Sequence, residues 1–175
     1  MYKKVLILLF FIPFHLLFAQ TNMLKDFPEG HTPEEIGKRL AYRFLTEKHA
    51  LHVGKWIGYP ETFYWSGALR YADGAKDKEL IQRLQEKFDF LFTEEKVLQP
   101  IMNHVDLNMF GSLPLEFYLV TKDLKYRYLG LPYADSQWEL PRNAKPHEKE
   151  WAEKGYSWQT RLWIDDMYMI TIVQT

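Results

Sequence analysis

Adjacent carboxylates within an apolar stretch are the first feature of this sequence that could do chemistry. Asp165 and Asp166 follow Trp163 and Ile164 and are followed by Met167. An ionised aspartate is almost never fully buried without a partner. The pair therefore either caps the start of a helix or faces a polar cavity lined by aromatic side chains. Carboxyl groups in such a cavity can act as general acids and bases.

A second candidate segment, residues 104–111, contains His104 and Asp106. This segment could also have a purely structural role, because Asp106 or Asn108 could cap a helix. One His-x-Asp pair could supply two metal ligands, but no second histidine cluster completes a site, so we expect no metal. The sequence contains neither a glycine-rich phosphate loop nor a serine nucleophile elbow.

The elements that must position these residues are helices. Thr32, Pro33 and Glu35 form a capping box with proline at the first helical position. Apolar residues recur at helical spacing, and no period-two alternation appears, so we expect strands only as short loop pairings. Six helices are predicted. The first three start at Thr32, near Pro60 and at Asp77, the fourth spans about 108–121, the fifth starts at Asp123, and the last runs from near Trp158 to Thr175. A long loop is predicted over residues 139–155.

Two stretches of the chain repeat one pattern. Residues 68–80 and 114–126 each end one helix, turn at a Lys-Asp pair and begin another. Repeated helical hairpins indicate a helical array or a toroid. The apolar helical pattern also continues to Thr175 without a stop signal. We therefore expect residues 21–175 to be the N-terminal part of a larger helical domain.

The first twenty residues have the pattern of a signal peptide. Lys3 and Lys4 precede an apolar run over residues 5–18, and Ala19 offers a small residue for cleavage. The alternative is a retained membrane anchor, but the run is shorter than the roughly 20 residues that a spanning helix needs. We expect residues 1–20 to be removed and the protein to be exported, to the periplasm or outside the cell, without a membrane association.

The composition limits the possible partners and the means of stabilisation. The 22 basic and 23 acidic residues are interspersed, so there is no basic stripe of the kind that binds nucleic acid. Cysteine is absent, so an exported chain must rely on packing rather than disulfides. Aromatic residues make up 17% of the chain, a surplus that could serve the core or the faces of sugar rings.

Four segments together resemble the unsaturated rhamnogalacturonyl hydrolases and the related glucuronyl hydrolases, which are glycoside hydrolases. These segments are 58–61, 106–111, 134–138 and 161–169, and the resemblance extends from Thr32 to Thr175. It implies an (α/α)6 toroid of twelve alternating inner and outer helices, of which this chain would supply about half. It also implies an oligosaccharide substrate and catalysis without a metal or cofactor.

The resemblance implies roles for individual residues. An aspartate hydrates the C4–C5 double bond of an unsaturated uronic acid at the non-reducing end of an oligosaccharide made by a lyase. By motif position Asp165 is this acid/base, Asp106 is the second carboxylate, and Asp166 is structural; Trp163 and His104 contact the sugar. Two close carboxylates, with burial against Trp163, would raise the pKa of one and keep it a neutral acid.

Two other functions fit the same sequence features. A non-catalytic saccharide-binding or scaffold protein of the toroid fold would keep the aromatic residues but would not need Asp165. Another toroid enzyme, such as an epimerase or a lyase, would need a histidine or tyrosine base, and the sequence offers no such cluster. Asp165 therefore discriminates between these functions, because fold alone does not fix activity.

Overall fold

The computed structural model of the chain describes residues 26–174. It divides into two units, residues 1–36 and residues 37–175. The predicted signal peptide, residues 1–20, lies outside the described residues. Among those that are described, no helix is long and apolar enough to cross a membrane.

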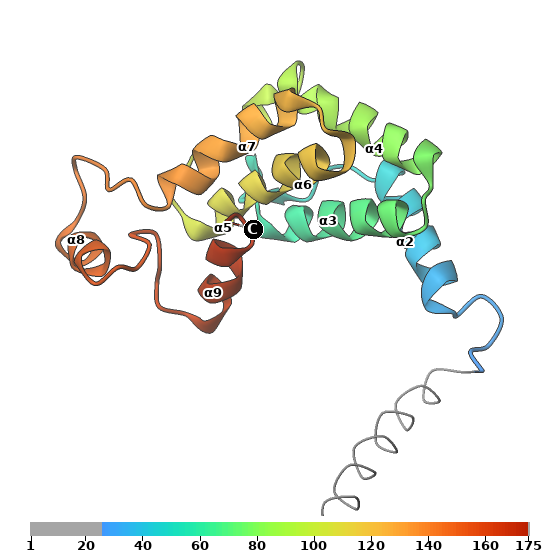
Figure 1. The fold of residues 1–175 in the computed structure, drawn as a ribbon, viewed down its shortest axis with the longest axis horizontal. Helices are drawn as coiled ribbons and strands as arrows, with labels where there is room; N and C mark the ends of the chain where they lie inside the picture. Colours follow the sequence, from blue (N-terminus) through green and yellow to red (C-terminus); the bar gives the residue numbers. More distant parts are fainter. Residues whose placement is uncertain (1–25, 175) are drawn as a thin grey trace, which may run out of the picture. The chain divides into compact units, whose positions relative to one another are not determined.

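The described chain is mostly helical, which confirms the predicted all-α class and agrees with part of an (α/α)6 toroid (Figure 1). Its two short strands, β1 and β2, pair antiparallel in the connection between α2 and α3. The elements are α2 (Pro33–Thr46), β1 (Leu51–His52), β2 (Trp56–Ile57), α3 (Tyr59–Gly74), α4 (Lys78–Asp89), η1 (Phe90–Phe92), η2 (Lys96–Leu98), α5 (Val105–Asn108), η3 (Met109–Gly111), α6 (Ser112–Thr121), α7 (Leu124–Ser136), α8 (Pro146–Glu153) and α9 (Ile164–Thr171).

The predicted helix starts are present as hydrogen bonds. The Glu35 N–H donates to Thr32 Oγ1 at 3.2 Å, and the Thr32 N–H donates to Glu35 Oε2 at 3.0 Å, which completes the capping box of α2. Asp77 accepts the Leu80 N–H at 3.0 Å, and Asp123 accepts the Lys125 N–H at 3.0 Å. These side chains satisfy amide groups that a helix leaves without partners in its first turn.

A cluster of aromatic rings forms the centre of the core. Helix α6 lies between α3 and α7 (Figure 1), and Phe117 of α6 packs with Trp65 of α3, Phe88 of α4 and Tyr126 of α7. The ring centroids of Phe88 and Phe117 are 4.9 Å apart, and those of Phe117 and Tyr126 are 5.1 Å apart. Much of the aromatic surplus therefore stabilises the fold.

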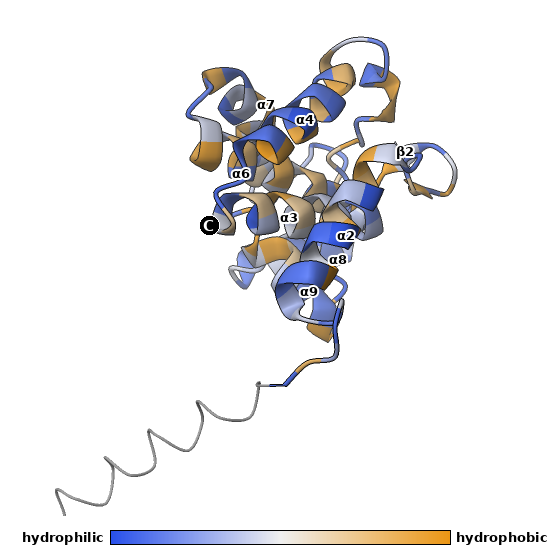
Figure 2. Cartoon of the chain, turned by 90° about the vertical axis from the view of Figure 1, so that its right-hand side faces the viewer, coloured by the Kyte–Doolittle hydropathy of each residue, from blue (hydrophilic) through white to orange (hydrophobic). Residues whose placement is uncertain are grey.

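Helix α4 shows how the hydropathy pattern selects the buried face. Leu80, Leu84 and Phe88 recur at a spacing of four residues and are fully buried, while charged residues occupy the other face. Hydrophilic and hydrophobic segments alternate along this helix in Figure 2, as expected for an amphipathic helix on the surface of a core.

Three predicted element boundaries were wrong. The stretch 139–155 is not a loop throughout, because α8 forms within it where the Lys145 N–H donates to Glu148 Oε2 at 2.6 Å. The fourth helix begins earlier, at Val105, and the 3₁₀ turn η3 interrupts it. The last helix begins at Ile164 rather than near Trp158, whose indole N–H instead donates to the Ser136 carbonyl at 2.7 Å.

Gly111 allows a close approach between η3 and α7. A Cβ atom at this position would overlap Cβ of Tyr133, and Tyr133 is buried and hydrogen-bonded to the Pro100 carbonyl. We expect Gly111→Ala to lower the free energy of unfolding by about 3 kcal/mol, because a packed core must shift to admit the methyl group. Chemical denaturation measures this loss.

Gly67→Ala is the matched control for Gly111→Ala. Gly67 lies in the interior of α3, and a Cβ atom there meets nothing within 4 Å. Alanine loses less backbone entropy than glycine when a helix forms, so Gly67→Ala should stabilise the protein by about 0.5–1 kcal/mol. Equal effects of the two substitutions would contradict the packing argument.

A half-buried histidine fixes the connection between α2 and β1. His49 lies between two carboxylates, with Nδ1 2.6 Å from Glu61 Oε1 and Nε2 3.1 Å from Glu95 Oε2. Glu61 also accepts the Ala50 N–H at 3.0 Å. Burial opposes the charged imidazolium, but the hydrogen bonds and the charges of Glu61 and Glu95 outweigh it and raise the pKa of His49.

This raised pKa predicts a pH dependence of stability. A raised pKa in the folded state contributes stability that is fully present below the unfolded value, about 6.5, and that is lost as the pH rises through the folded value. We therefore expect wild type to lose stability relative to His49→Gln as the pH rises above about 6.5. Thermal unfolding of both proteins across this range measures the difference, and parallel curves would refute the prediction.

Candidate active site

Arg161 joins two carboxylates that are 60 residues apart in the sequence. Its Nη2 and Nη1 atoms donate to Asp106 at 2.9 and 3.2 Å. Its Nε and Nη2 atoms donate to Oδ1 of Asp166 at 3.0 and 2.6 Å. A guanidinium presents its N–H groups in a planar fork, so one arginine can hold both carboxylates at once. This ion pair connects α5 with the start of α9.

Asp166 is the buried member of the adjacent pair. Its side chain is 2% exposed, and besides the Arg161 guanidinium it accepts the backbone N–H groups of Arg161 at 2.6 Å and Trp163 at 3.3 Å. The Thr160 hydroxyl donates to it at 3.2 Å. Burial alone would raise the pKa of Asp166, but the hydrogen bonds and charge of Arg161, with the Trp163 N–H, hold it below its usual value. Asp166 therefore fixes the turn that precedes α9.

Asp165 faces a different direction. Its side chain is 48% exposed, its Oδ2 atom lies 3.7 Å from Arg161 Nη2, and within the described residues its carboxylate accepts no hydrogen bond. The expected burial against Trp163 was therefore wrong. Successive residues of a helix point about 100° apart, so only one of the adjacent carboxylates can face α5, and that one is Asp166.

Trp163 and His104 lie beside the same ion pair. The Arg161 Cζ atom is 4.2 Å from the centre of the Trp163 ring, which is a cation–π distance, and Trp163 is 59% exposed. His104 Nδ1 accepts the Asp106 N–H at 3.2 Å and lies 3.6 Å from Asp106 Oδ2. His104 thus caps α5. In the purely structural interpretation of this segment, we had given the capping role to Asp106 or Asn108.

A tight turn aims Arg161 back at α5. Leu162 has a left-handed backbone conformation, with φ of 60°, and its N–H donates to Thr160 Oγ1 at 3.0 Å. This conformation costs a residue with a Cβ atom roughly 1–2 kcal/mol. The hydrogen bonds that converge on Asp166 offset the cost. Helices α5 and α9 lie side by side in Figure 1, and this turn directly precedes α9.

Buried polar groups anchor α5 to the end of α7. Asn108 is fully buried, and its Nδ2 atom donates to the Tyr133 carbonyl at 2.7 Å. The Ser136 hydroxyl donates to Asn108 Oδ1 at 2.9 Å. Asn108 and Ser136 belong to two of the segments that carry the family resemblance, and their contacts fix Asp106 relative to the helical core.

A comparison with known protein families shows which family the chain belongs to. Residues 29–175 match the sequence profile of Glycosyl Hydrolase Family 88. The chain belongs to this family. It is the family of the unsaturated glucuronyl and rhamnogalacturonyl hydrolases, so the resemblance is confirmed. No curated protein and no solved structure matches the chain.

Membership in family 88 makes the chain a glycosidase with an oligosaccharide substrate. The structure brings the four predicted site residues into one cluster, because Asp106, Asp165 and Trp163 all adjoin the Arg161 guanidinium and His104 adjoins Asp106. Among the described residues, no group of three or more histidines and carboxylates is placed to hold a metal ion.

Arg161 is the residue of this cluster that the sequence did not reveal. Its spacing to Asp165 and Asp166 is four and five residues, which allows a local ion pair across the turn. Nothing in the local sequence indicates the pairing with Asp106, 55 residues away, because that contact depends on the packing of α5 against α9.

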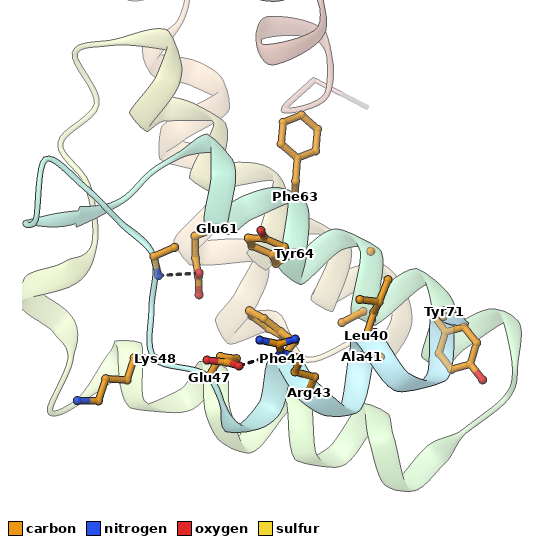
Figure 3. Close-up of a pocket in the computed structure, with 14 residues that line it drawn as sticks. Leu40, Ala41, Arg43, Phe44, Glu47, Lys48, Glu61, Phe63, Tyr64 and Tyr71 are labelled. Atoms are coloured by element: carbon orange, nitrogen blue, oxygen red, sulfur yellow. Dashed lines mark hydrogen bonds and ion pairs between the residues drawn. The ribbon is translucent and has the colours of Figure 1, made fainter. Parts of the chain in front are cut away.

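A cavity lies elsewhere in this family 88 chain, away from the predicted site residues. It has a volume of about 630 Å³ and lies between α3 and residues 37–50, where Phe44, Phe63 and Tyr64 line it (Figure 3). Leu40 of α2 also lines it and is 62% exposed. The four predicted site residues do not line it.

Proposed function

We propose that the protein removes a Δ4,5-unsaturated uronic acid from the non-reducing end of oligosaccharides that a polysaccharide lyase has generated, with rhamnogalacturonan fragments as the favoured substrate. One observation carries the proposal. Asp165 is exposed and accepts no hydrogen bond within the described chain, yet it lies 3.7 Å from an arginine that holds Asp106 at 2.9 Å. A carboxyl group that is free to gain and lose a proton is what hydration of the double bond requires.

The reaction begins at the double bond rather than at the anomeric carbon. Asp165 donates a proton to C4, and the positive charge that develops at C5 is shared with the ring oxygen. Asp165, now a carboxylate, accepts a proton from the water that adds to C5. The resulting hemiketal opens by breaking the bond between C5 and the ring oxygen, which leaves a ketone at C5 and a hemiacetal at C1. Collapse of this hemiacetal to an aldehyde releases the next sugar.

The neighbours of Asp165 fit supporting roles. Asp106 accepts hydrogen bonds from Arg161 and is negatively charged, so it can bind sugar hydroxyls and stabilise positive charge that develops at C5. Trp163 has an exposed ring face of the kind on which a sugar can stack. His104 is partly exposed and can hydrogen-bond the substrate.

Absorbance of the unsaturated uronyl group tests the proposal directly. Full-length gene product would be mixed with lyase-cut rhamnogalacturonan and with lyase-cut glycosaminoglycan fragments. Loss of the double-bond absorbance together with release of a shortened oligosaccharide is the expected result, and it should be faster with rhamnogalacturonan fragments. Binding of either fragment by folded protein without any loss of absorbance would instead favour the non-catalytic saccharide-binding alternative.

We also propose that the protein is exported before it meets this substrate. The signal-peptide pattern of residues 1–20 supports this location. N-terminal sequencing of protein purified from the producing cell should begin near Gln20. A start at Met1 would refute the proposed cleavage.

A further inference from the structure

We propose that Arg161 is a positioning residue that decides which carboxyl group of this site carries the exchangeable proton. This inference rests on the proposed function and assigns a role to a residue that does not itself react. In this positioning role, the guanidinium of Arg161 holds Asp106 and Asp166 in their ionised forms and leaves Asp165 as the group that protonates.

The hydrogen bonds of Arg161 are distributed unequally over the three carboxylates. A guanidinium has five N–H groups. Four hydrogen bonds from these groups go to Asp106 and Asp166, at 2.6–3.2 Å, whereas Asp165 lies at 3.7 Å, beyond hydrogen-bond distance. Arg161 also donates its backbone N–H to Asp166. Asp165 therefore receives only the longer-range charge of the arginine.

This distribution sets the cost of protonating each carboxylate. A proton on Asp106 or Asp166 would weaken charge-assisted hydrogen bonds, which are about twice as strong as neutral ones. A proton on Asp165 disrupts no hydrogen bond of the described chain. Three carboxylates surround a single arginine here, and His104 is the other titratable side chain beside Asp106, at 3.6 Å. The repulsion among the three is relieved most cheaply by a proton on Asp165.

Arg161 also holds Trp163, the predicted sugar platform. Its guanidinium lies over the indole ring at 4.2 Å while its N–H groups hold Asp106. One side chain thus fixes the second carboxylate and the aromatic face relative to each other. A lysine could keep the charge, but a single ammonium group cannot reproduce the fork and the stacked plane.

The experiment measures kcat and KM against pH for full-length wild type, Arg161→Lys and the double variant Arg161→Gln/Asp166→Asn, with lyase-cut rhamnogalacturonan fragments. Arg161→Lys should lower kcat at least tenfold and also raise KM, because the charge stays while Asp106 and the Trp163 ring lose the positions that the guanidinium gives them. The double variant removes one positive and one negative charge, so the fully buried Asp166 side chain is not left as an ion without its arginine. It should move the alkaline limb of the kcat/KM profile to higher pH by about one unit, because Asp106 is no longer neutralised beside Asp165.

Arg70→Gln is the matched control. Arg70 also forms an ion pair with a carboxylate, Glu116, at 2.6 Å, but it connects α3 with α6 and touches none of the predicted site residues. Its substitution should leave the pH profile in place. A folded double variant with an unmoved alkaline limb, or Arg161→Lys with kcat within threefold of wild type, would overturn the positioning role. Wild type that consumes no double bond would refute the proposed function itself, which is a separate outcome.

Discussion

Asp165→Asn should lower kcat by several orders of magnitude while leaving KM and the free energy of unfolding almost unchanged. Asparagine has the same shape, but it cannot donate a proton to C4 of the substrate, and loss of a general acid alone costs roughly 10²–10⁴ in rate. Because the substitution removes an interaction made only in the transition state, the loss should appear in kcat. Absorbance of the double bond measures turnover, and binding of the intact oligosaccharide measures retained affinity.

The stability expected of Asp165→Asn follows from the exposure of this side chain. Its side chain is 48% exposed and its carboxylate accepts no hydrogen bond within the described residues, so the substitution should change the free energy of unfolding by less than about 0.5 kcal/mol. Denaturation of wild type and variant side by side measures this. An Asp165→Asn protein that still turns over substrate at a rate close to that of wild type would exclude Asp165 as the acid/base.

Asp166→Ala, in contrast to Asp165→Asn, should lower the free energy of unfolding by about 3–5 kcal/mol. The buried carboxylate of Asp166 accepts hydrogen bonds from the Arg161 side chain and backbone, the Thr160 hydroxyl and the Trp163 N–H. Its removal takes two hydrogen bonds from the Arg161 guanidinium, which keeps Asp106 as a partner, and leaves the backbone amides of Arg161 and Trp163 without an acceptor, at a cost of about 1–3 kcal/mol each. Urea denaturation measures the change.

Asp165→Ala is the control for Asp166→Ala, because it removes an adjacent carboxylate of the same helical turn. It should leave the unfolding midpoint close to that of wild type. Equal destabilisation by the two substitutions would show that the turn before α9 does not depend on the buried carboxylate. Loss of the α9 turn should also reduce activity, since Arg161 and Trp163 precede it in the chain.

Because the pKa of Asp166 is lowered in the folded state, the stability loss expected for Asp166→Ala depends on pH. A group whose pKa is lower in the folded state contributes stability that is present above its unfolded value, about 3.9, and that is lost as the pH falls through the folded value. The difference in stability between wild type and Asp166→Ala should therefore be largest above about pH 4 and should shrink in more acidic solution. A difference that stays constant down to acidic pH would contradict the ionised state of Asp166.

Features that depend on near neighbours in the chain could be predicted from the sequence. The capping box of Thr32 and the caps of Asp77 and Asp123 were correct, because a cap needs only a side chain and an amide two or three residues away. The helical spacing of apolar residues was correct for α4 for the same reason, since it repeats with the helical turn. The all-α class and the family followed from these patterns and from the motif segments.

The start of the last helix could not be predicted locally. The apolar pattern favoured a helix from about Trp158, but Ser157 and Trp158 donate hydrogen bonds to Gln137 and Ser136 carbonyls at the end of α7. These partners lie about twenty residues away, and no local periodicity encodes them. Tertiary hydrogen bonds therefore overrode a helical preference and moved the start of α9 to Ile164.

The sequence by itself determined the helical class, the family and the residue types of the candidate site, because these depend on local periodicity and on motif segments. Only the tertiary structure decided which of two adjacent aspartates is buried and that Arg161 binds Asp106. Asp165 and Asp166 have the same chemistry and nearly the same local sequence. The physical difference between them is direction, since the helical turn points Asp166 at Arg161 and leaves Asp165 facing outward.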